Sequence, residues 1–180
     1  MRRMIQRIMK NIYHCFYGCL FFMLACGPAE NKQAPVTTAA ADSERMTIPG
    51  VEKLNYSDTI LLKADEKMRF DKELFRVRAA RKIKLQFFNT EKKSAMSMTH
   101  NVVVLKKGTD IADFADAVHN AKAEQYVPAS VGPLVISHTR LVGGGETDSI
   151  EFILPKPGIY DFICSFPGHW GTMQGKIVAQ

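Results

Sequence analysis

Three side chains with metal-binding chemistry lie in one ten-residue stretch, CSFPGHWGTM, near the C-terminal end of the chain. Cys164, His169 and Met173 follow the spacing Cys-x4-His-x3-Met. They offer a thiolate, an imidazole nitrogen and a weak thioether sulfur, donors that suit soft and intermediate transition metals. A second histidine, His100, stands far upstream, at the start of an apolar run. The stretch could therefore form one side of a metal site that a distant histidine completes.

Taken singly, each of these residues has a simpler explanation. A lone cysteine is most often a small buried hydrophobe, and a lone methionine usually fills a core. His119 and His138 have no partner pattern, so we expect them to be surface histidines. The combined set is different, because two histidines and a cysteine in trigonal coordination with a long axial methionine form the blue-copper electron-transfer site. The hypothesis is a mononuclear copper site held by His100, Cys164, His169 and Met173.

The residues around the stretch explain how its ligands could converge. The run 159–164 alternates like a strand, so Cys164 shares a face with Tyr160, which we expect to point inward. Pro167 fixes one φ and Gly168 permits the turn that follows, which returns His169 towards Cys164. A strand resumes near residue 175, and the histidine from a distant strand would pin the loop to the body of the domain.

The second half of the chain has the period-two pattern of an all-β domain. Apolar residues alternate with polar ones in short runs separated by turn signals, which favours an antiparallel sandwich or barrel. The apolar run 101–105, NVVVL, predicts a strand buried on both faces. The alternating runs are 74–78, 82–88, 150–154 and 159–164.

One segment has a helical period instead. Ile111, Phe114 and Val118 recur at helical spacing within a segment that runs from Thr109 to about residue 122. Thr109 or Asp110 can cap its start. The coarse prediction is one short helix inserted between strands.

The N-terminal segment resembles an export signal. Four basic residues and no acidic one fall in the first 25 positions, and an apolar run extends from Ile12 to Ala25. That run is too short for a membrane-spanning helix, which needs roughly 20 apolar residues. It ends in Met-Leu-Ala-Cys, which resembles a bacterial lipobox with Cys26 as the lipidated residue; ordinary cleavage near Ala25 is the alternative. We therefore predict a lipoprotein-type signal peptide at 1–25, a flexible tether at 26–54 and a folded domain at 55–180.

The number of cysteines and the net charge limit which functions are expected. Of four cysteines, Cys15 and Cys19 would leave with the signal and Cys26 would carry lipid, so Cys164 has no disulfide partner in the domain. A free thiol in an oxidising compartment is a liability unless it is buried or bound to metal. Beyond residue 25 the chain has 20 basic and 18 acidic residues, a net charge of only +2, and no basic cluster interleaved with aromatics. Nucleic-acid binding is therefore not expected.

The domain is similar to azurin, a small blue-copper protein of the cupredoxin class, over about residues 60–180. The resemblance covers His-Asn at 100–101, the stretch HTRLVGGGETDSI at 138–150, and CSFPGH running into MQG at 164–175. It implies an all-β Greek-key β-sandwich with one short inserted helix. It also implies equatorial ligands at His100, Cys164 and His169 and an axial ligand at Met173.

The same resemblance suggests roles for the neighbours of the ligands. Asn101 would tie the first ligand strand to the ligand loop near Ser165, and the backbone N–H of Phe166 would donate to the Cys164 sulfur. Thr99 stands where azurins have glycine, so a contact between its carbonyl oxygen and copper is left open. The azurin disulfide has no counterpart, Val102 replaces a buried tryptophan, and Trp170 replaces a small residue.

The function expected from these observations is electron transfer by one Cu(I)/Cu(II) ion, without enzymatic activity. Met98, Pro167 and Trp170 would form an apolar docking patch around His169 for an exported c-type cytochrome or a periplasmic oxidase or reductase. The protein would face the periplasm as a lipoprotein, or be soluble there. Copper delivery or storage by the same ligands is the alternative. Catalysis is disfavoured, because a binuclear copper site needs a second cysteine in the loop and a Cys/His nucleophile would leave Met173 without a role.

Overall fold

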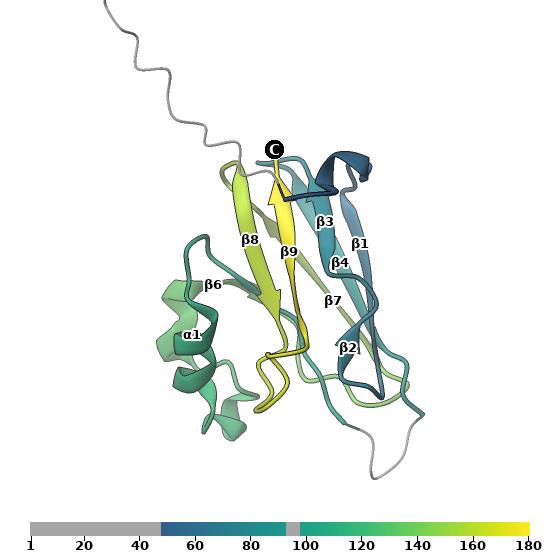
Figure 1. Cartoon of the computed structure of the whole chain (residues 1–180). Coiled ribbons are helices and arrows are strands. Elements are labelled where there is room, and N and C mark those ends of the chain that lie inside the picture. Colours follow the sequence, from purple (N-terminus) through teal and green to yellow (C-terminus); the bar gives the residue numbers. More distant parts are fainter. Residues whose placement is uncertain (1–47, 93–97) are drawn as a thin grey trace, which may run out of the picture. The chain divides into compact units, whose positions relative to one another are not determined.

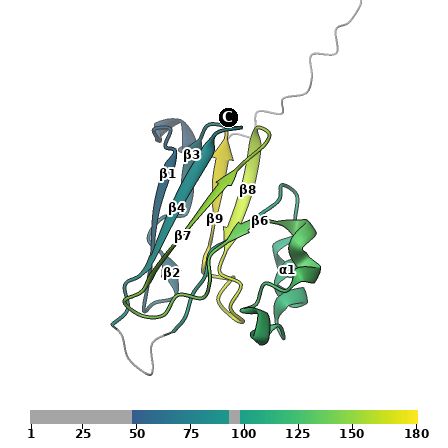
Figure 2. The same ribbon diagram turned by 180° about the vertical axis from the view of Figure 1, so that it is seen from behind.

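Two β-sheets pack face to face in the computed structural model, which describes residues 48–92 and 98–180 (Figures 1 and 2). One sheet has the order β2-β1-β4-β7, and the other has the order β3-β9-β8-β5-β6. The strands are β1 (Thr59–Asp65), β2 (Arg69–Phe70), β3 (Leu74–Val77), β4 (Lys82–Asn89), β5 (Val103–Leu105), β6 (Val135–His138), β7 (Thr147–Ile153), β8 (Gly158–Ile163) and β9 (Gln174–Ala179). The predicted sandwich with a short helix is confirmed.

Alternating side chains build the core between the sheets. In β4 the buried residues Ile83, Leu85 and Phe87 alternate with residues that face outward, as the sequence predicts. They meet the inward face of the other sheet, which includes Phe162 of β8 and Ile177 of β9. This apolar layer supplies most of the driving force for folding, at roughly 25 cal/mol per Å² of apolar surface buried.

Not every pairing between strands is antiparallel, in contrast to the expectation from the short alternating runs. β1 pairs in parallel with β4, and β3 pairs in parallel with β9. Parallel neighbours require crossover connections, which here carry the chain from one sheet to the other. The first strands of the domain thereby lie beside strands that come much later in the chain.

Strand β5 is buried on both faces, as its uninterrupted apolar sequence predicts. Val104 faces the core between the sheets, while Val103 and Leu105 face a second apolar cluster formed with Phe114 and Val118 of α1 (Ile111–Val118). Asp110 caps this helix through a hydrogen bond from the Asp113 backbone N–H. The helix ends at Val118, which is also the last residue of the apolar period, and not at the expected residue 122. The short 3-10 helices η2 (Lys122–Glu124) and η3 (Ala129–Leu134) follow. Figures 1 and 2 show α1 beside β6, outside the two sheets.

The last residues of the expected tether belong to the fold. The 3-10 helix η1 (Val51–Lys53) contacts β3, and Val51 is buried. The predicted signal peptide, Cys26 and most of the tether lie outside the described residues. Within the described part of the chain, no helix has the length and apolarity needed to cross a membrane.

Candidate metal centre

The structure brings three of the predicted ligands together. One donor atom each from His100, Cys164 and His169 lies within 4.8 Å of the other two, and all three side chains are buried. The Nδ1 atoms of the two histidines are 3.1 Å apart, and the Cys164 Sγ lies 3.8 Å from Nδ1 of His169. These residues come from two segments more than 60 positions apart, so the cluster depends on the tertiary fold.

Two backbone connections hold these segments at one end of the sandwich. His100 precedes β5 and is fixed by paired backbone hydrogen bonds with Val142, at 3.1 and 2.7 Å. Cys164 directly follows β8, and the loop from 164 to 173 leads into β9. In Figure 1 this loop lies at the lower end of the sandwich, opposite the C-terminus.

The loop between Cys164 and Met173 is closed by its own backbone. The His169 N–H donates to the Phe166 carbonyl at 3.1 Å across Pro167 and Gly168, and Gly168 has a φ of +83°. Proline followed by a residue with positive φ is the signature of a type II turn. The Cys164 N–H donates to the Met173 carbonyl at 2.9 Å, which brings the two ends of the loop together.

Met173 lies in the buried core next to this cluster. Its side chain is fully buried and belongs to the same apolar cluster as Cys164. Its backbone N–H donates to the His169 carbonyl at 2.8 Å. Backbone hydrogen bonds therefore place Met173 next to Cys164 and His169 in the loop.

Asn101 connects the two segments that carry the cluster. Its Oδ1 accepts a hydrogen bond from the Ser165 N–H at 2.9 Å, and its Nδ2 donates to the Ser165 hydroxyl at 2.8 Å. Both residues are buried. Because buried polar groups are costly when unpaired, this double link fixes the position of the loop relative to β5.

Burial dominates the electrostatics of the cluster. It raises the pKa of the Cys164 thiol to about 11, and hydrogen bonds from the backbone N–H groups of Asn101 and Phe166 partly oppose this effect. Burial, together with the neighbouring His100, lowers the pKa of His169 to about 4. Burial also lowers the pKa of His100, although the nearby carboxylate of Glu91 opposes this.

This donor set fits copper. At neutral pH both imidazoles are uncharged and can offer a lone pair, whereas the thiol must lose its proton to solvent when it binds a cation. Two imidazoles with one thiolate suit both oxidation states of copper. None of the three donors is a carboxylate, which is the ligand type that magnesium and calcium prefer.

The remaining predicted residues differ in their contacts and exposure. The rings of Phe166 and His169 are in contact, with centroids 4.5 Å apart, and Pro167 and Trp170 are partly exposed. Met98 is 41% exposed. Thr99 is partly buried beside His100.

His119 and His138 are not members of the cluster. His119 follows α1 and is exposed. His138 is an exposed residue at the end of β6, where it pairs with Val103. Their positions agree with the expectation that these two are surface histidines.

Sequence reasoning missed Glu91, a buried acidic residue beside the cluster. Its Oε1 atom lies 3.8 Å from Nε2 of His100. The residue is only 9% exposed although it follows β4 in a polar segment. No spacing rule links a glutamate in such a segment to a histidine nine positions later.

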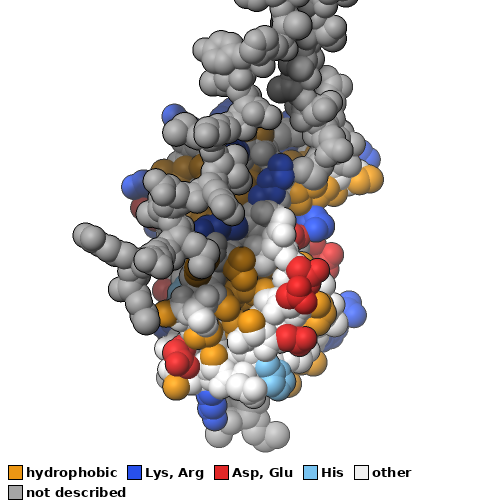
Figure 3. Space-filling model, turned by 90° about the vertical axis from the view of Figure 1, so that its left-hand side faces the viewer, with side chains coloured by type: hydrophobic (Ala, Val, Ile, Leu, Met, Phe, Trp, Pro, Cys, Tyr) orange, Lys and Arg blue, Asp and Glu red, His pale blue; other side chains and the backbone are white. Residues whose placement is uncertain are grey.

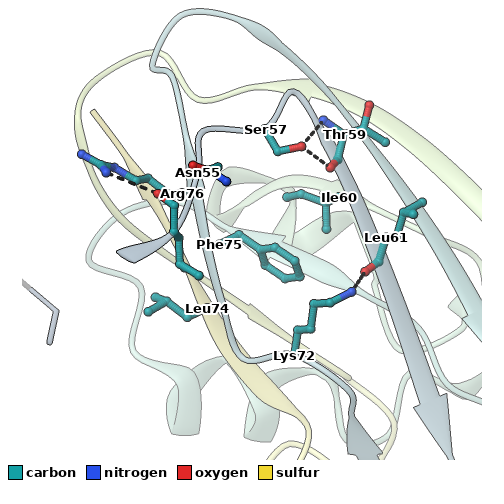
Figure 4. Close-up of a pocket in the computed structure, with 10 residues that line it drawn as sticks. Asn55, Ser57, Thr59, Ile60, Leu61, Lys72, Leu74, Phe75 and Arg76 are labelled. Carbon is teal, nitrogen blue, oxygen red and sulfur yellow. Dashed lines mark hydrogen bonds between the residues drawn. The ribbon is translucent and has the colours of Figure 1, made fainter. Parts of the chain in front are cut away.

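A pocket elsewhere in the domain is unrelated to this cluster. It lies between β1 and β3, and Ser57, Ile60, Phe75 and Arg76 are among the residues that line it (Figure 4). None of the proposed ligands belongs to its lining.

Comparisons with known proteins agree with this geometry. Residues 58–180 match the profile of copper-binding proteins of the plastocyanin/azurin family. Azurin of Alcaligenes faecalis is 35% identical over 122 residues, which cover 66% of this chain and 94% of that protein. Outer membrane protein H.8 of Neisseria gonorrhoeae is 31% identical over 119 residues, which cover 64% of each chain.

Solved structures show the same relationship. The crystal structure of dithionite-reduced auracyanin from the photosynthetic bacterium Roseiflexus castenholzii superposes with a TM-score of 0.62 and 31% identity. The match covers 70% of this chain and 99% of auracyanin. The matched region contains the histidine–cysteine–histidine cluster and both sheets. The chain therefore belongs to the plastocyanin/azurin family of copper-binding proteins and is an azurin-like blue-copper protein with one copper ion as its cofactor.

Proposed function

We propose that this protein is an exported electron carrier that works at the periplasmic side of a bacterial membrane, attached through a lipid on Cys26. His100, Cys164, His169 and Met173 would hold the copper. The observation that carries the proposal is the buried group of two imidazoles and one thiol within 4.8 Å of one another. Bound copper supplies a one-electron Cu(I)/Cu(II) couple at this site.

The protein keeps the ligands in place while an electron passes. Paired hydrogen bonds anchor His100 to Val142, and the Asn101–Ser165 link holds the loop. Because these contacts do not depend on the metal, the donor positions can stay nearly constant in both oxidation states. The four residues that hold the metal come from the protein and are buried, which argues against an open position for a substrate and against an enzymatic role.

The electron leaves through the edge of the His169 ring. The partly exposed Phe166 contacts this ring, and we propose that Met98, Pro167 and Trp170 form the docking patch around it. Weak redox encounters bury small areas, so a modest patch is sufficient. A c-type cytochrome, or a periplasmic oxidase or reductase, with an apolar contact area would match such a patch. Figure 3 shows the side of the domain that carries α1, where hydrophobic side chains gather beside a group of acidic ones.

A lipid anchor would keep the carrier close to membrane-bound partners. The lipobox-like sequence ending in Cys26 supports the anchor, and one relative carries the name of an outer membrane protein. A Cys26→Ser variant should leave the membrane fraction. If the variant stays with the membrane to the same extent, the anchor at Cys26 is wrong.

The central test is the visible absorption spectrum of the Cu(II) protein. The wild type should show intense thiolate-to-copper charge transfer, and Cys164→Ser should lose it while the fold is retained, as judged by circular dichroism. His138→Gln is the matched control and should keep the band, because His138 is exposed and is not a member of the cluster. A wild-type protein that binds Cu(II) without an intense band would refute the proposal.

The rate of copper loss separates electron transfer from copper delivery or storage. A carrier of electrons should retain its metal for hours in a weak chelator, because its buried ligands are held by the fold. Loss within seconds would favour delivery.

A further inference from the structure

His100 has two ring nitrogens, and the structure places them in different surroundings. Nδ1 faces the cluster, 3.1 Å from Nδ1 of His169. Nε2 is buried on the other side of the ring and has no hydrogen-bond partner among the described residues. The nearest charged atom recorded for it is Oε1 of Glu91, at 3.8 Å. Burying a ring nitrogen without a hydrogen-bond partner costs free energy, so the position of Nε2 beside Glu91 requires an explanation.

Glu91 is held in place by hydrogen bonds with two neighbours, Met98 and Asn89. Its Oε2 accepts the backbone N–H of Met98 at 2.8 Å, and its own N–H donates to Oδ1 of Asn89 at 3.1 Å. Asn89 is fully buried and donates from Nδ2 to the carbonyl oxygens of Met98 and Val142. One carboxylate oxygen is thus committed to the backbone, and the other is aimed at the imidazole.

We propose that Glu91 is a positioning residue that completes a carboxylate–histidine–copper arrangement at His100; this rests on the proposed function. The carboxylate accepts the Nε2–H of His100 and so leaves the Nδ1 lone pair for the metal. A shortening of about 1 Å brings the pair to the length of a normal hydrogen bond. Carboxylate partners of this kind fix the tautomer and orientation of a ligand histidine and raise its basicity.

The contact between the two histidines points to the same tautomer. A hydrogen bond between two Nδ1 atoms requires one donor and one acceptor. If His100 carried its proton on Nδ1, the bare Nε2 lone pair would face the carboxylate of Glu91, which is unfavourable. With the proton on Nε2, His100 accepts from His169 and donates towards Glu91, so both contacts are favourable.

The charge of Glu91 also affects the two oxidation states differently. A negative charge next to a copper ligand stabilises Cu(II) more than Cu(I), which lowers the reduction potential. Asp65 is the other carboxylate whose charge acts on His100, but its side chain accepts from Lys67 and makes no hydrogen bond to the ring. Asp65→Asn is therefore a matched control that removes the same charge without removing a ring contact.

The test uses the full chain in detergent solution, with two readouts. In the metal-free protein, nitrogen NMR of the His100 ring should show the proton on Nε2, and Glu91→Ala should shift the ring towards the Nδ1 tautomer. In the Cu(II) protein, Glu91→Gln should keep the visible band but lower the Cu(II)-to-Cu(I) affinity ratio about tenfold, which corresponds to a rise of about 59 mV for a one-electron couple. Asp65→Asn should change both the tautomer of His100 and the reduction potential less than the Glu91 variants do.

The outcomes are distinguishable. If the wild type lacks the intense band, the proposed function fails, whatever Glu91 does. If the band is present, the inference is overturned by a wild-type His100 protonated on Nδ1, or by a Glu91→Gln potential equal to that of Asp65→Asn. If Glu91→Ala does not fold, the tautomer of His100 in the wild type and the reduction potential of Glu91→Gln still test the inference.

Discussion

Met173 is the proposed ligand whose metal-binding atom can be removed with little change in the packing of the core. It is fully buried in the same core cluster as Cys164, so the alternative is that this methionine only fills space in the core. Leucine has almost the same volume, so Met173→Leu should cost less than about 1.5 kcal/mol of stability. The substitution therefore isolates the thioether sulfur.

We expect Met173→Leu to stay blue and to have a higher reduction potential. Losing an axial donor weakens Cu(II) binding more than Cu(I) binding, and a change on the order of tenfold in their ratio corresponds to about 59 mV. Voltammetry and the visible spectrum measure the effect. Met98→Leu, at an exposed methionine, is the control and should change neither. An unchanged potential and spectrum in Met173→Leu would show that the residue is core filler.

At the scale of single residues, the sequence predicted the cluster and the Asn101–Ser165 link, but not Glu91. Cys164, His169 and Met173 lie in one loop with a diagnostic spacing, and His100 could be added because it begins a buried strand. Glu91 could not be found, because its burial depends on how the segment after β4 folds back on Met98. Only tertiary structure shows which carboxylate lies beside a ligand.

The turn in the ligand loop is an element whose backbone conformation can be tested directly. Gly168 has a φ of +83°, and a β-carbon at that position would meet no atom within 4 Å. A side chain there is strained by its backbone angle alone, at about 1–2 kcal/mol for a left-handed residue. The backbone conformation at Gly168, and not a steric clash, is therefore what favours glycine at this position.

Gly168→Ala should therefore destabilise the metal-free protein by about 1 kcal/mol, measured by denaturant unfolding. Gly171→Ala lies in the same loop, also meets no atom within 4 Å and has no positive φ, so it should change the free energy of unfolding by less than about 0.5 kcal/mol. Equal effects in the two variants would contradict the assignment of strain to the turn.

Strands were predicted from sequence where one face is consistently apolar. β4 alternates cleanly, β8 alternates over part of its length, and β5 is apolar throughout. β1 was missed, because the exposed Leu61 interrupts its alternation, and β6 is short and only partly buried. The parallel pairs were also missed, because the pattern of one strand does not show which strand lies beside it.

The stability of the whole metal-free molecule should depend on pH through its buried histidines. The pKa of His169 is about 4 in the folded state, compared with about 6.5 in an unfolded chain, and burial lowers the pKa of His100 as well. The unfolded chain therefore binds more protons between pH 6.5 and 4. The stabilisation is fully present above pH 6.5 and is lost as the pH falls towards 4.

For His169 alone the loss should be on the order of 3 kcal/mol. The free energy of unfolding, measured by denaturant titration from pH 7 to 4, tests this expectation. His169→Gln should flatten the pH dependence, whereas His119→Gln, at an exposed histidine, should leave it unchanged. The expectation fails if the wild type and His169→Gln have the same slope.

The parallel pairing of β3 with β9 has a consequence for how the protein matures. It joins Leu74 to Lys176, so the last strand can be placed only after nearly all of the domain has been synthesised. Contacts so distant in sequence form slowly, because their loop-closure entropy is lost before pairing compensates for it. Three of the proposed ligands lie immediately before that strand, and the fourth lies more than sixty residues earlier. A chain whose last strand is not yet in place therefore cannot assemble the centre, and the intensity of the blue colour in a preparation saturated with Cu(II) measures the fraction of molecules that have finished folding.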